Sequence, residues 1–127
     1  MDLQAFYESL TQYDGFNANA EVEGELLENF YPGLSGIAAK QRVIYMPMMS
    51  SVVCEVALVE VASASDVQAV KDIFQARIDA QAGGGAWYPD SVETWKNDSR
   101  VVSNGNCVMV IAWNDCDTAV AAFNALF

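Results

Sequence analysis

Residues 52–62 read VVCEVALVEVA, the clearest strand in the chain. Valine fits a pleated, packed surface, and here it recurs at both odd and even positions. Apolar side chains therefore point to both faces of the strand, which is typical of an interior position in a sheet. Glu55 and Glu60 are its only charged residues, so a carboxylate stands in the middle of an otherwise apolar element.

This strand is predicted to belong to one of two hairpins. Its partner covers residues 41–50, where Pro47 cannot donate a ladder hydrogen bond and therefore indicates an edge or bulged strand. The second hairpin runs from Val101 to Trp113 around Asn104-Gly105, a pair suited to the two positive φ angles of a type I′ turn. On its return strand, one face should carry Cys107, Met109, Ile111 and Trp113, and the other Val108, Val110 and Ala112.

Apolar residues at helical spacing predict helices before, between and after the hairpins. Ser65 and Gln68 have the spacing of a capping box, which indicates the start of a helix that ends at the Gly83–Gly85 run. The expected helices cover residues 3–13, 25–31, 65–82, 89–96 and 117–126.

The resulting order, α-α-β-β-α-α-β-β-α, describes a single α+β domain over residues 1–127. A chain of 127 residues fits one domain and leaves little room for two. Two hairpins separated by helices predict an antiparallel sheet of about four strands, with the helices mainly on one face.

Acidic residues outnumber basic ones by 17 to 6, which gives a net charge of −11. Nucleic-acid binding needs a basic patch that neutralises phosphates, and the basic residues here are scattered, so we expect no nucleic-acid partner. No apolar run approaches the roughly 20 residues of a membrane helix, so we expect no integral membrane segment. Met1 to Gln4 lack the basic, apolar start of a signal peptide, which indicates a cytoplasmic protein or one whose signal was removed.

The chain contains no histidine. Ser-His-Asp and Cys-His catalytic sites and histidine-based metal sites are therefore excluded, and the commonest general base at neutral pH is missing. Three cysteines do not indicate a disulfide framework, so we expect free thiols at Cys54, Cys107 and Cys116. Cys116 should stand near a helix start, which lowers the pKa of a thiol, but the flanking aspartates oppose this effect, and we expect an unreactive surface thiol.

Two patterns resemble metal sites without completing one. Met46, Met48 and Met49 are soft ligands suited to copper(I), but methionine is also ordinary core filler. The acidic run at Asp115 resembles a calcium loop, but Val120 stands where an EF-hand has the glycine of its sixth position. Helix capping explains the aspartates more simply, and we expect neither a metal nor another cofactor.

Three residues form the candidate ligand or interaction surface: Glu55, Trp87 and Tyr88. A buried carboxylate at position 55 would have to be paired, hydrogen-bonded or protonated, whereas one at the edge of the sheet would face solvent. Trp87 and Tyr88 stand beside the glycine run at Gly83–Gly85, where exposed aromatic rings can contact a ligand or a partner. Such rings more often fold under the loop and complete the core.

Three stretches carry a family likeness. They are the serine-rich approach to the Glu-bearing strand at residues 50–59, the start of the following helix at 66–71, and the closing strands at 101–111. Together they resemble domain of unknown function 4358, a bacterial family that also has a Glu at this point of its strand. The resemblance implies a short exported or lipid-anchored protein of the clostridial cell envelope, and it implies no activity.

These observations favour a non-catalytic ligand- or protein-binding domain of the bacterial cell envelope. One alternative is a carboxylate-dependent hydrolase without histidine, which would need a second carboxylate about 5–9 Å from Glu55. Another alternative is a purely structural subunit of a homo-oligomer. A cleft at Glu55 would discriminate between these functions. A second carboxylate among the residues that line it would favour the hydrolase, and aromatic side chains there would favour binding.

Overall fold

The computed structural model describes residues 1–48, 52–86 and 88–127. In these residues the helices are α1 (Leu3–Leu10), α2 (Gly24–Phe30), α3 (Val67–Ala80), α4 (Pro89–Asn97) and α5 (Cys116–Asn124). The strands are β1 (Ala20–Glu21), β2 (Ala39–Met46), β3 (Glu55–Val61), β4 (Ser99–Asn104) and β5 (Cys107–Ala112). Short helical turns, η1 (Leu34–Gly36), η2 (Ala64–Asp66) and η3 (Gln81–Gly85), lie between them.

One antiparallel sheet holds these strands in the order β1-β2-β3-β5-β4. β3 pairs with β2 on one side and with β5 on the other, which confirms the interior position predicted from its apolar composition. The α+β class and the two hairpins are also confirmed. The described residues form five strands rather than about four, because the two-residue β1 is too short to produce a periodicity in the sequence.

β2 ends at Met46, directly before Pro47, rather than continuing to residue 50. The register of its pairing with β3 shifts between Ala39 and Gln41, so the irregularity lies at the opposite end from the proline. β2 is also not an edge strand, because Glu21 of β1 pairs with its Tyr45. Pro47 therefore terminates the strand, as its missing N–H group requires, and does not mark an edge.

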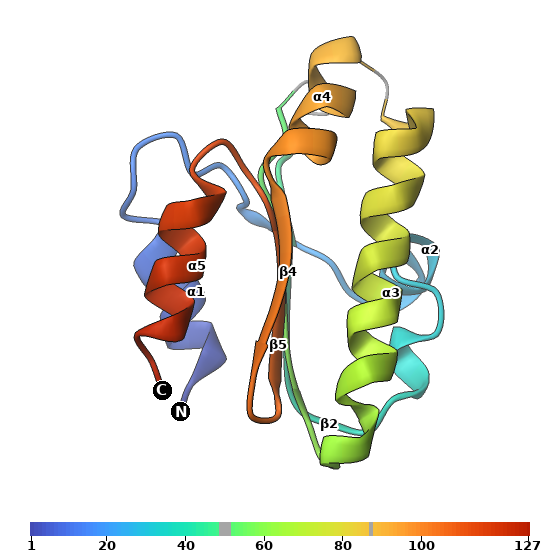
Figure 1. Ribbon diagram of the computed structural model, residues 1–127, viewed down its shortest axis with the longest axis vertical. Helices are drawn as coiled ribbons and strands as arrows, with labels where there is room; N and C mark the ends of the chain where they lie inside the picture. Colours follow the sequence, from blue (N-terminus) through green and yellow to red (C-terminus); the bar gives the residue numbers. More distant parts are fainter. Residues whose placement is uncertain (49–51, 87) are drawn as a thin grey trace.

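Helices cover both faces of the sheet, and three of the five helices in the described residues, including the longest, lie on one face. α1 and α5 lie on one face, and α2, α3 and α4 lie on the other (Figure 1). The reason is that β3 and β5 carry apolar side chains at nearly every position. Successive side chains of a strand point to opposite faces of the sheet, so helices must cover both faces to bury them. We call these two sides the α1/α5 face and the α3 face.

The alternation on β5 follows the prediction. Cys107, Met109 and Ile111 belong to the core of the α1/α5 face, while Val108 and Val110 belong to the core of the α3 face. The two cores therefore share strands but no side chains.

The turn between β4 and β5 differs from the predicted one by one position. Asn104 pairs with Cys107, so the loop consists of Gly105 and Asn106 rather than Asn104 and Gly105. Gly105 has a φ of 58°, and no non-glycine residue in the described part of the chain has a positive φ. Glycine at the first central position matches a type II′ turn, which, like type I′, follows the twist of a hairpin.

The predicted capping box at Ser65 and Gln68 does not form. A 3-10 turn over Ala64–Asp66 precedes α3, which begins at Val67 without a side-chain cap. At its other end α3 runs into η3, where Gly84 adopts a φ of 111°. The glycine run thus ends the helix as expected, since glycine reaches positive φ without steric cost.

The described helices include none that combines the length and the apolar character needed to cross a membrane.

Candidate functional site

Glu55 is the first residue of β3, and only 4% of its surface is exposed. Its side chain points to the α3 face, like those of Ala57 and Val59 at alternate positions of the same strand. The sequence left open whether this carboxylate is buried or faces solvent. The fold buries it, because β3 is covered on both sides by neighbouring strands and on this face by α3.

Two side chains from other elements satisfy the Glu55 carboxylate. Arg77 of α3 donates from Nη2 to Oε1 at 2.9 Å and from Nε to Oε2 at 3.0 Å, which forms a two-point ion pair. Tyr31, directly after α2, donates its hydroxyl to the same Oε2. Charge-assisted bonds of this forked kind are among the strongest in proteins, and they fix the orientation of both groups.

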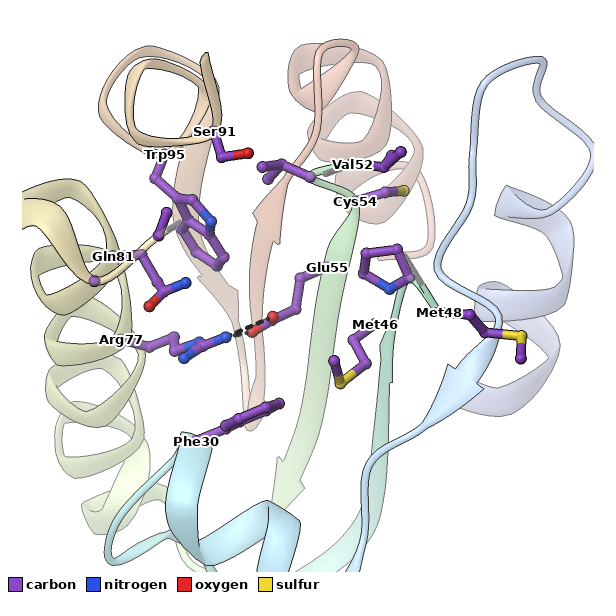
Figure 2. Close-up of a pocket in the computed structure, with 14 residues that line it drawn as sticks. Phe30, Met46, Met48, Val52, Cys54, Glu55, Arg77, Gln81, Ser91 and Trp95 are labelled. Atoms are coloured by element: carbon purple, nitrogen blue, oxygen red, sulfur yellow. Dashed lines mark hydrogen bonds and ion pairs between the residues drawn. The ribbon is translucent and has the colours of Figure 1, made fainter. Parts of the chain in front are cut away.

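Aromatic rings surround the guanidinium group of Arg77. Its central carbon lies 4.5 Å from the centre of the Phe30 ring and 5.4 Å from that of Trp95. Figure 2 shows Arg77 between these rings, with Phe30 on the α2 side and Trp95 on the α4 side. A planar, weakly hydrated guanidinium stacks well on aromatic faces, so these rings hold the group in place without using its N–H donors.

Burial and the network set the protonation states. Burial, followed by the adjacent Glu55 charge, raises the pKa of Tyr31 well above its ordinary value, so its hydroxyl stays a neutral donor. Burial alone would lower the pKa of Arg77, but the hydrogen bonds and charge of Glu55 outweigh it and raise that pKa. The guanidinium is therefore charged at every relevant pH.

A cavity of about 310 Å³ lies over this network on the α3 face. Glu55 and Arg77 line it together with Gln81 and Ser91, which are its other polar side chains among the described residues. Ser91 is 96% buried, since only 4% of its surface is exposed. The apolar side chains of the wall include Phe30, Met46, Met48, Val52, Val53 and Trp95 (Figure 2).

The polar groups of this cavity retain hydrogen-bonding capacity. The side chains of Gln81 and Ser91 make no hydrogen bond to another described residue, and the Arg77 guanidinium donates to Glu55 through Nε and Nη2 but to no described residue through Nη1. Arginine carries five N–H donors, of which Glu55 accepts two. The cavity therefore offers both donors and acceptors to a molecule that enters it.

A second hollow of about 370 Å³ lies near the chain ends, between α1 and Leu126. Its polar side chains are Asp2 and Ser9, and both are engaged within α1. Asp2 accepts a hydrogen bond from the Ala5 N–H group at 3.2 Å, and Ser9 donates to the Phe6 carbonyl at 2.6 Å. Despite its larger volume, this hollow offers a ligand few free partners, and the cavity at Glu55 is the better candidate site.

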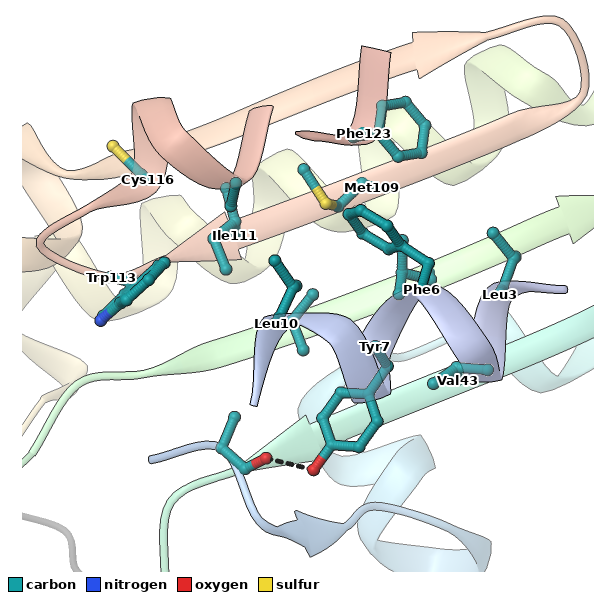
Figure 3. Close-up of a cluster of buried hydrophobic side chains, with 14 of the residues drawn as sticks. Leu3, Phe6, Tyr7, Leu10, Val43, Met109, Ile111, Trp113, Cys116 and Phe123 are labelled. Atoms are coloured by element: carbon teal, nitrogen blue, oxygen red, sulfur yellow. Dashed lines mark hydrogen bonds between the residues drawn. The ribbon is translucent and has the colours of Figure 1, made fainter. Parts of the chain in front are cut away.

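The core of the α1/α5 face consists mainly of apolar and aromatic side chains (Figure 3). Phe6 and Phe123 meet edge to face with ring centres 6.1 Å apart. Tyr7 points its hydroxyl at the Ala18 carbonyl, at 2.5 Å, so the chain itself satisfies this polar group.

The three residues of the predicted ligand or interaction surface do not lie together at the cavity in the described structure. Glu55 lines the cavity, as described above. Tyr88 precedes α4 and is 48% exposed, and it is not among the described residues that line the cavity. Trp87 lies outside the described residues. A role for any of the three in binding stays a prediction.

The structure describes two of the three residues of the methionine pattern. Met46 and Met48 both line the cavity, whereas Met49 lies outside the described residues. Cys54 also borders the cavity, but its sulfur belongs to the other face, where it accepts a hydrogen bond from the Asn17 N–H group at 3.2 Å. Burial raises the pKa of this thiol to about 11, which opposes the thiolate form that a metal needs.

The acidic run at Asp115 also lacks the geometry of a metal site, because among residues 1–48, 52–86 and 88–127 no three acidic or cysteine side chains are placed to hold an ion. Asp115 occupies the N-cap position of α5, as the capping interpretation requires, but its side chain makes no cap hydrogen bond. Its backbone carbonyl instead accepts from the N–H groups of Thr118 and Ala119.

All three cysteines are free and buried, and the expectation of free thiols is confirmed. The prediction of a surface position for Cys116 is wrong, because only 2% of its surface is exposed. The start of α5 turns this side chain into the core of the α1/α5 face. Cys54 and Cys107 lie near opposite ends of β3, since Cys107 pairs with Glu60 while Cys54 precedes Glu55.

The partners of Glu55 did not emerge from the sequence. Arg77 stands between Phe74 and Ile78, inside the buried stripe of α3, where a basic residue needs a partner. This position was a detectable signal, because a lone buried acid and a lone buried base in different elements attract each other. Tyr31 and Trp95 gave no such signal, since aromatic residues are ordinary core constituents.

Comparison with protein families gives a match over residues 13–112 to the model described as "Domain of unknown function (DUF4358)". The matched region contains the whole of the Glu55–Arg77–Tyr31 network and all five strands. No curated protein and no solved structure matches the chain. The chain therefore belongs to the DUF4358 family, which confirms the family likeness carried by its strands.

Proposed function

We propose that this member of the DUF4358 family binds a small molecule, without converting it, in the cavity over Glu55 and Arg77. The observation that carries the proposal is the position of a buried ion pair at the surface of a mostly apolar cavity. Paired charges of this kind hold their N–H groups in fixed directions, which is what a binding site requires.

The size and lining of the cavity support this function. Sites for small molecules typically have volumes of about 300–1,000 Å³, apolar walls and a few well-placed polar groups. The cavity here has about 310 Å³, at the small end of this range, and its apolar wall is interrupted only by the side chains named above.

Stability alone is a weak explanation of the ion pair. Replacing a buried ion pair with apolar residues of similar volume is often neutral or stabilising, so such pairs are poor stabilisers of a fold. The pair also does not need the cavity beside it, yet Nη1 of Arg77, a residue that lines the cavity, donates to none of the described residues. A binding role explains both features together.

Hydrolysis by a pair of carboxylates has less support. That chemistry needs two carboxyl groups on either side of the reacting bond, about 5–9.5 Å apart. Glu55 is the one carboxylate among the described residues that line the cavity, and both of its oxygens accept hydrogen bonds from Arg77. A carboxylate whose two oxygens both accept hydrogen bonds from Arg77 has neither oxygen free to act on a substrate.

We extend the proposal to the cell envelope on the family likeness alone. A protein of the envelope would meet its ligand outside the cytoplasm, which suits a binding protein that performs no chemistry. Protease treatment of intact cells that express the protein from its native gene tests this location. Digestion of the protein while a cytoplasmic marker survives supports it, and protection until the cells are lysed contradicts it.

Binding is tested by a ¹H–¹⁵N NMR screen of small aromatic and aliphatic compounds against the protein. We expect hits to shift the signals of Arg77 and of the Trp95 indole, while signals from the second hollow stay in place. A Gln81→Phe variant fills the cavity and should lose these shifts. Gln75→Phe is the matched control, because Gln75 is exposed on α3, the helix that leads directly into Gln81. Hits that persist unchanged in Gln81→Phe would refute the site.

A further inference from the structure

We infer that the cavity selects an uncharged molecule with a flat, apolar body and an amide-type group that accepts a hydrogen bond from Arg77. This inference rests on the proposed function and specifies its ligand. Three features of the cavity lead to it: its charge balance, its unused donors and the shape of its wall.

The charge balance favours a neutral ligand. The carboxylate of Glu55 and the guanidinium of Arg77 cancel at a separation of 2.9 Å, and no other charged side chain among the described residues lines the cavity. An anionic ligand would approach a chain with a net charge of −11 and would meet the Glu55 carboxylate. A cationic ligand would meet the guanidinium. Either charge would also lose its hydration without gaining an unpaired counter-charge.

The unused donors call for an acceptor on the ligand. Phe30 and Trp95 lie on either side of the guanidinium, so its edge is the part available to a ligand. Nη1 on this edge has no described partner, and a carbonyl oxygen is the acceptor that suits it. The side-chain amide of Gln81 and the hydroxyl of Ser91 can accept a hydrogen bond in return. An amide group supplies both the acceptor and the donor.

The wall calls for a flat apolar body. Phe30 and Trp95 contribute aromatic rings to this wall, and a flat aromatic group packs against such rings edge to face or offset more favourably than its buried area alone explains. Met46 and Met48 complete the wall with flexible thioether side chains, which adapt to the outline of a ring. Aliphatic chains would bury area here but would lack this aromatic packing.

Four probes of nearly equal size test the inference: benzamide, toluene, benzoate and benzylamine. Their affinities are measured by NMR titration at one pH and salt concentration. We expect benzamide to bind about tenfold more tightly than toluene, because its carbonyl can accept a hydrogen bond from the charged guanidinium of Arg77 and toluene has no acceptor. Benzoate and benzylamine should both bind more weakly than benzamide. Tighter binding of either charged probe, or equal binding of toluene, would overturn the inference.

An Arg77→Lys variant tests the role of the guanidinium edge. Lysine keeps the charge that Glu55 needs but lacks the planar, forked set of donors. We expect Arg77→Lys to remain folded and to reduce the preference for benzamide over toluene to less than about threefold. Arg100→Lys is the matched control, because Arg100 lies on β4 and pairs with Asp117 instead. An unchanged preference in Arg77→Lys would show that Arg77 does not select the ligand.

The two levels of the proposal fail in different ways. If none of the four probes shifts the signals of Arg77 or Trp95, the cavity is not a small-molecule site and the proposed function fails. If the probes bind there but rank in another order, the binding function stands and the ligand class is wrong.

Discussion

The two faces of the sheet use the same strands but handle buried polar groups differently. On the α1/α5 face, the hydroxyl of Tyr7 is satisfied by the backbone carbonyl of Ala18, so the chain closes its own hydrogen bond. On the α3 face, Tyr31 and Arg77 satisfy a carboxylate, and the guanidinium keeps further donors. A polar group that is fully satisfied only supports packing, whereas one with capacity left over can also bind.

The largest expected effect comes from breaking the ion pair. Arg77→Met leaves the Glu55 carboxylate buried without its counter-charge, and we expect the free energy of unfolding to fall by about 3–5 kcal/mol. Urea denaturation followed by circular dichroism measures it. The control Arg100→Met removes an exposed pair with Asp117 and should cost less than about 1 kcal/mol. Equal losses in the two variants would mean that the pair on the α3 face is effectively solvated.

Replacing the whole network separates the cost of a broken pair from its net value. A triple variant, Tyr31→Phe with Glu55→Leu and Arg77→Met, leaves no unpaired polar group. We expect it to recover most of the stability lost in Arg77→Met and to lose ligand binding. The single variant Glu55→Gln should lie between them, with a loss of roughly 1–3 kcal/mol. A triple variant less stable than Arg77→Met would show that the network stabilises the fold by itself.

A matched pair of tyrosine variants compares the faces directly. Tyr31→Phe removes a hydrogen bond to a charged acceptor, worth about 1.5–3 kcal/mol, and Tyr7→Phe removes one to a neutral carbonyl, worth about 0.5–1.5 kcal/mol. The same atom is deleted from a buried ring in both cases, so packing losses are small and similar. Urea denaturation of both variants should place Tyr31→Phe lower in stability, and the reverse order would contradict the charge-assisted network.

Alkaline pH should weaken both faces through the same two tyrosines. Burial raises the pKa of Tyr7 to about 12 and that of Tyr31 well above its ordinary value, whereas in the unfolded chain both titrate near pH 10. Above about pH 10 the unfolded state therefore binds fewer protons, and stability falls by up to about 1.4 kcal/mol per pH unit for each tyrosine. Below that pH the contribution is fully present.

Urea denaturation at intervals between pH 8 and pH 11 measures this slope. We expect a steeper decline in the wild type than in either phenylalanine variant, because each variant removes one titrating group. If Tyr31→Phe and the wild type decline in parallel, the hydroxyl of Tyr31 is not protected by burial.

The smallest effect concerns the three thiols, all of which lie in the core of the α1/α5 face. We expect the unreduced, denatured protein to release three thiols per chain, and the native protein to react with a thiol reagent slowly at pH 8. Burial protects Cys54, Cys107 and Cys116 and raises the pKa of each. Rapid labelling of one thiol in the native protein would show that this face opens locally. A count of one thiol after denaturation would indicate a disulfide.

Local patterns in the sequence predicted the elements well. The interior strand at residues 52–62, the helix that begins at Pro89 and the alternation along residues 107–113 follow from side-chain periodicity, which is a property of a few neighbouring residues. The sequence did not predict the two-residue β1 or the exact position of the β4–β5 turn. Both depend on which residues pair across neighbouring strands, and local periodicity does not show this. The division of the helices between the two faces likewise depends on packing and not on any single stretch of residues.

By itself the sequence determined the α+β class, the absence of histidine chemistry and the presence of one carboxylate in an apolar strand. Only the tertiary structure decided what that carboxylate does, because its partners Tyr31 and Arg77 are 24 and 22 residues away along the chain and belong to other elements. Periodicity reports which face a residue occupies, but it carries no information about which distant side chain shares that face. The cavity, which exists only between packed elements, could not be predicted from any single stretch of residues.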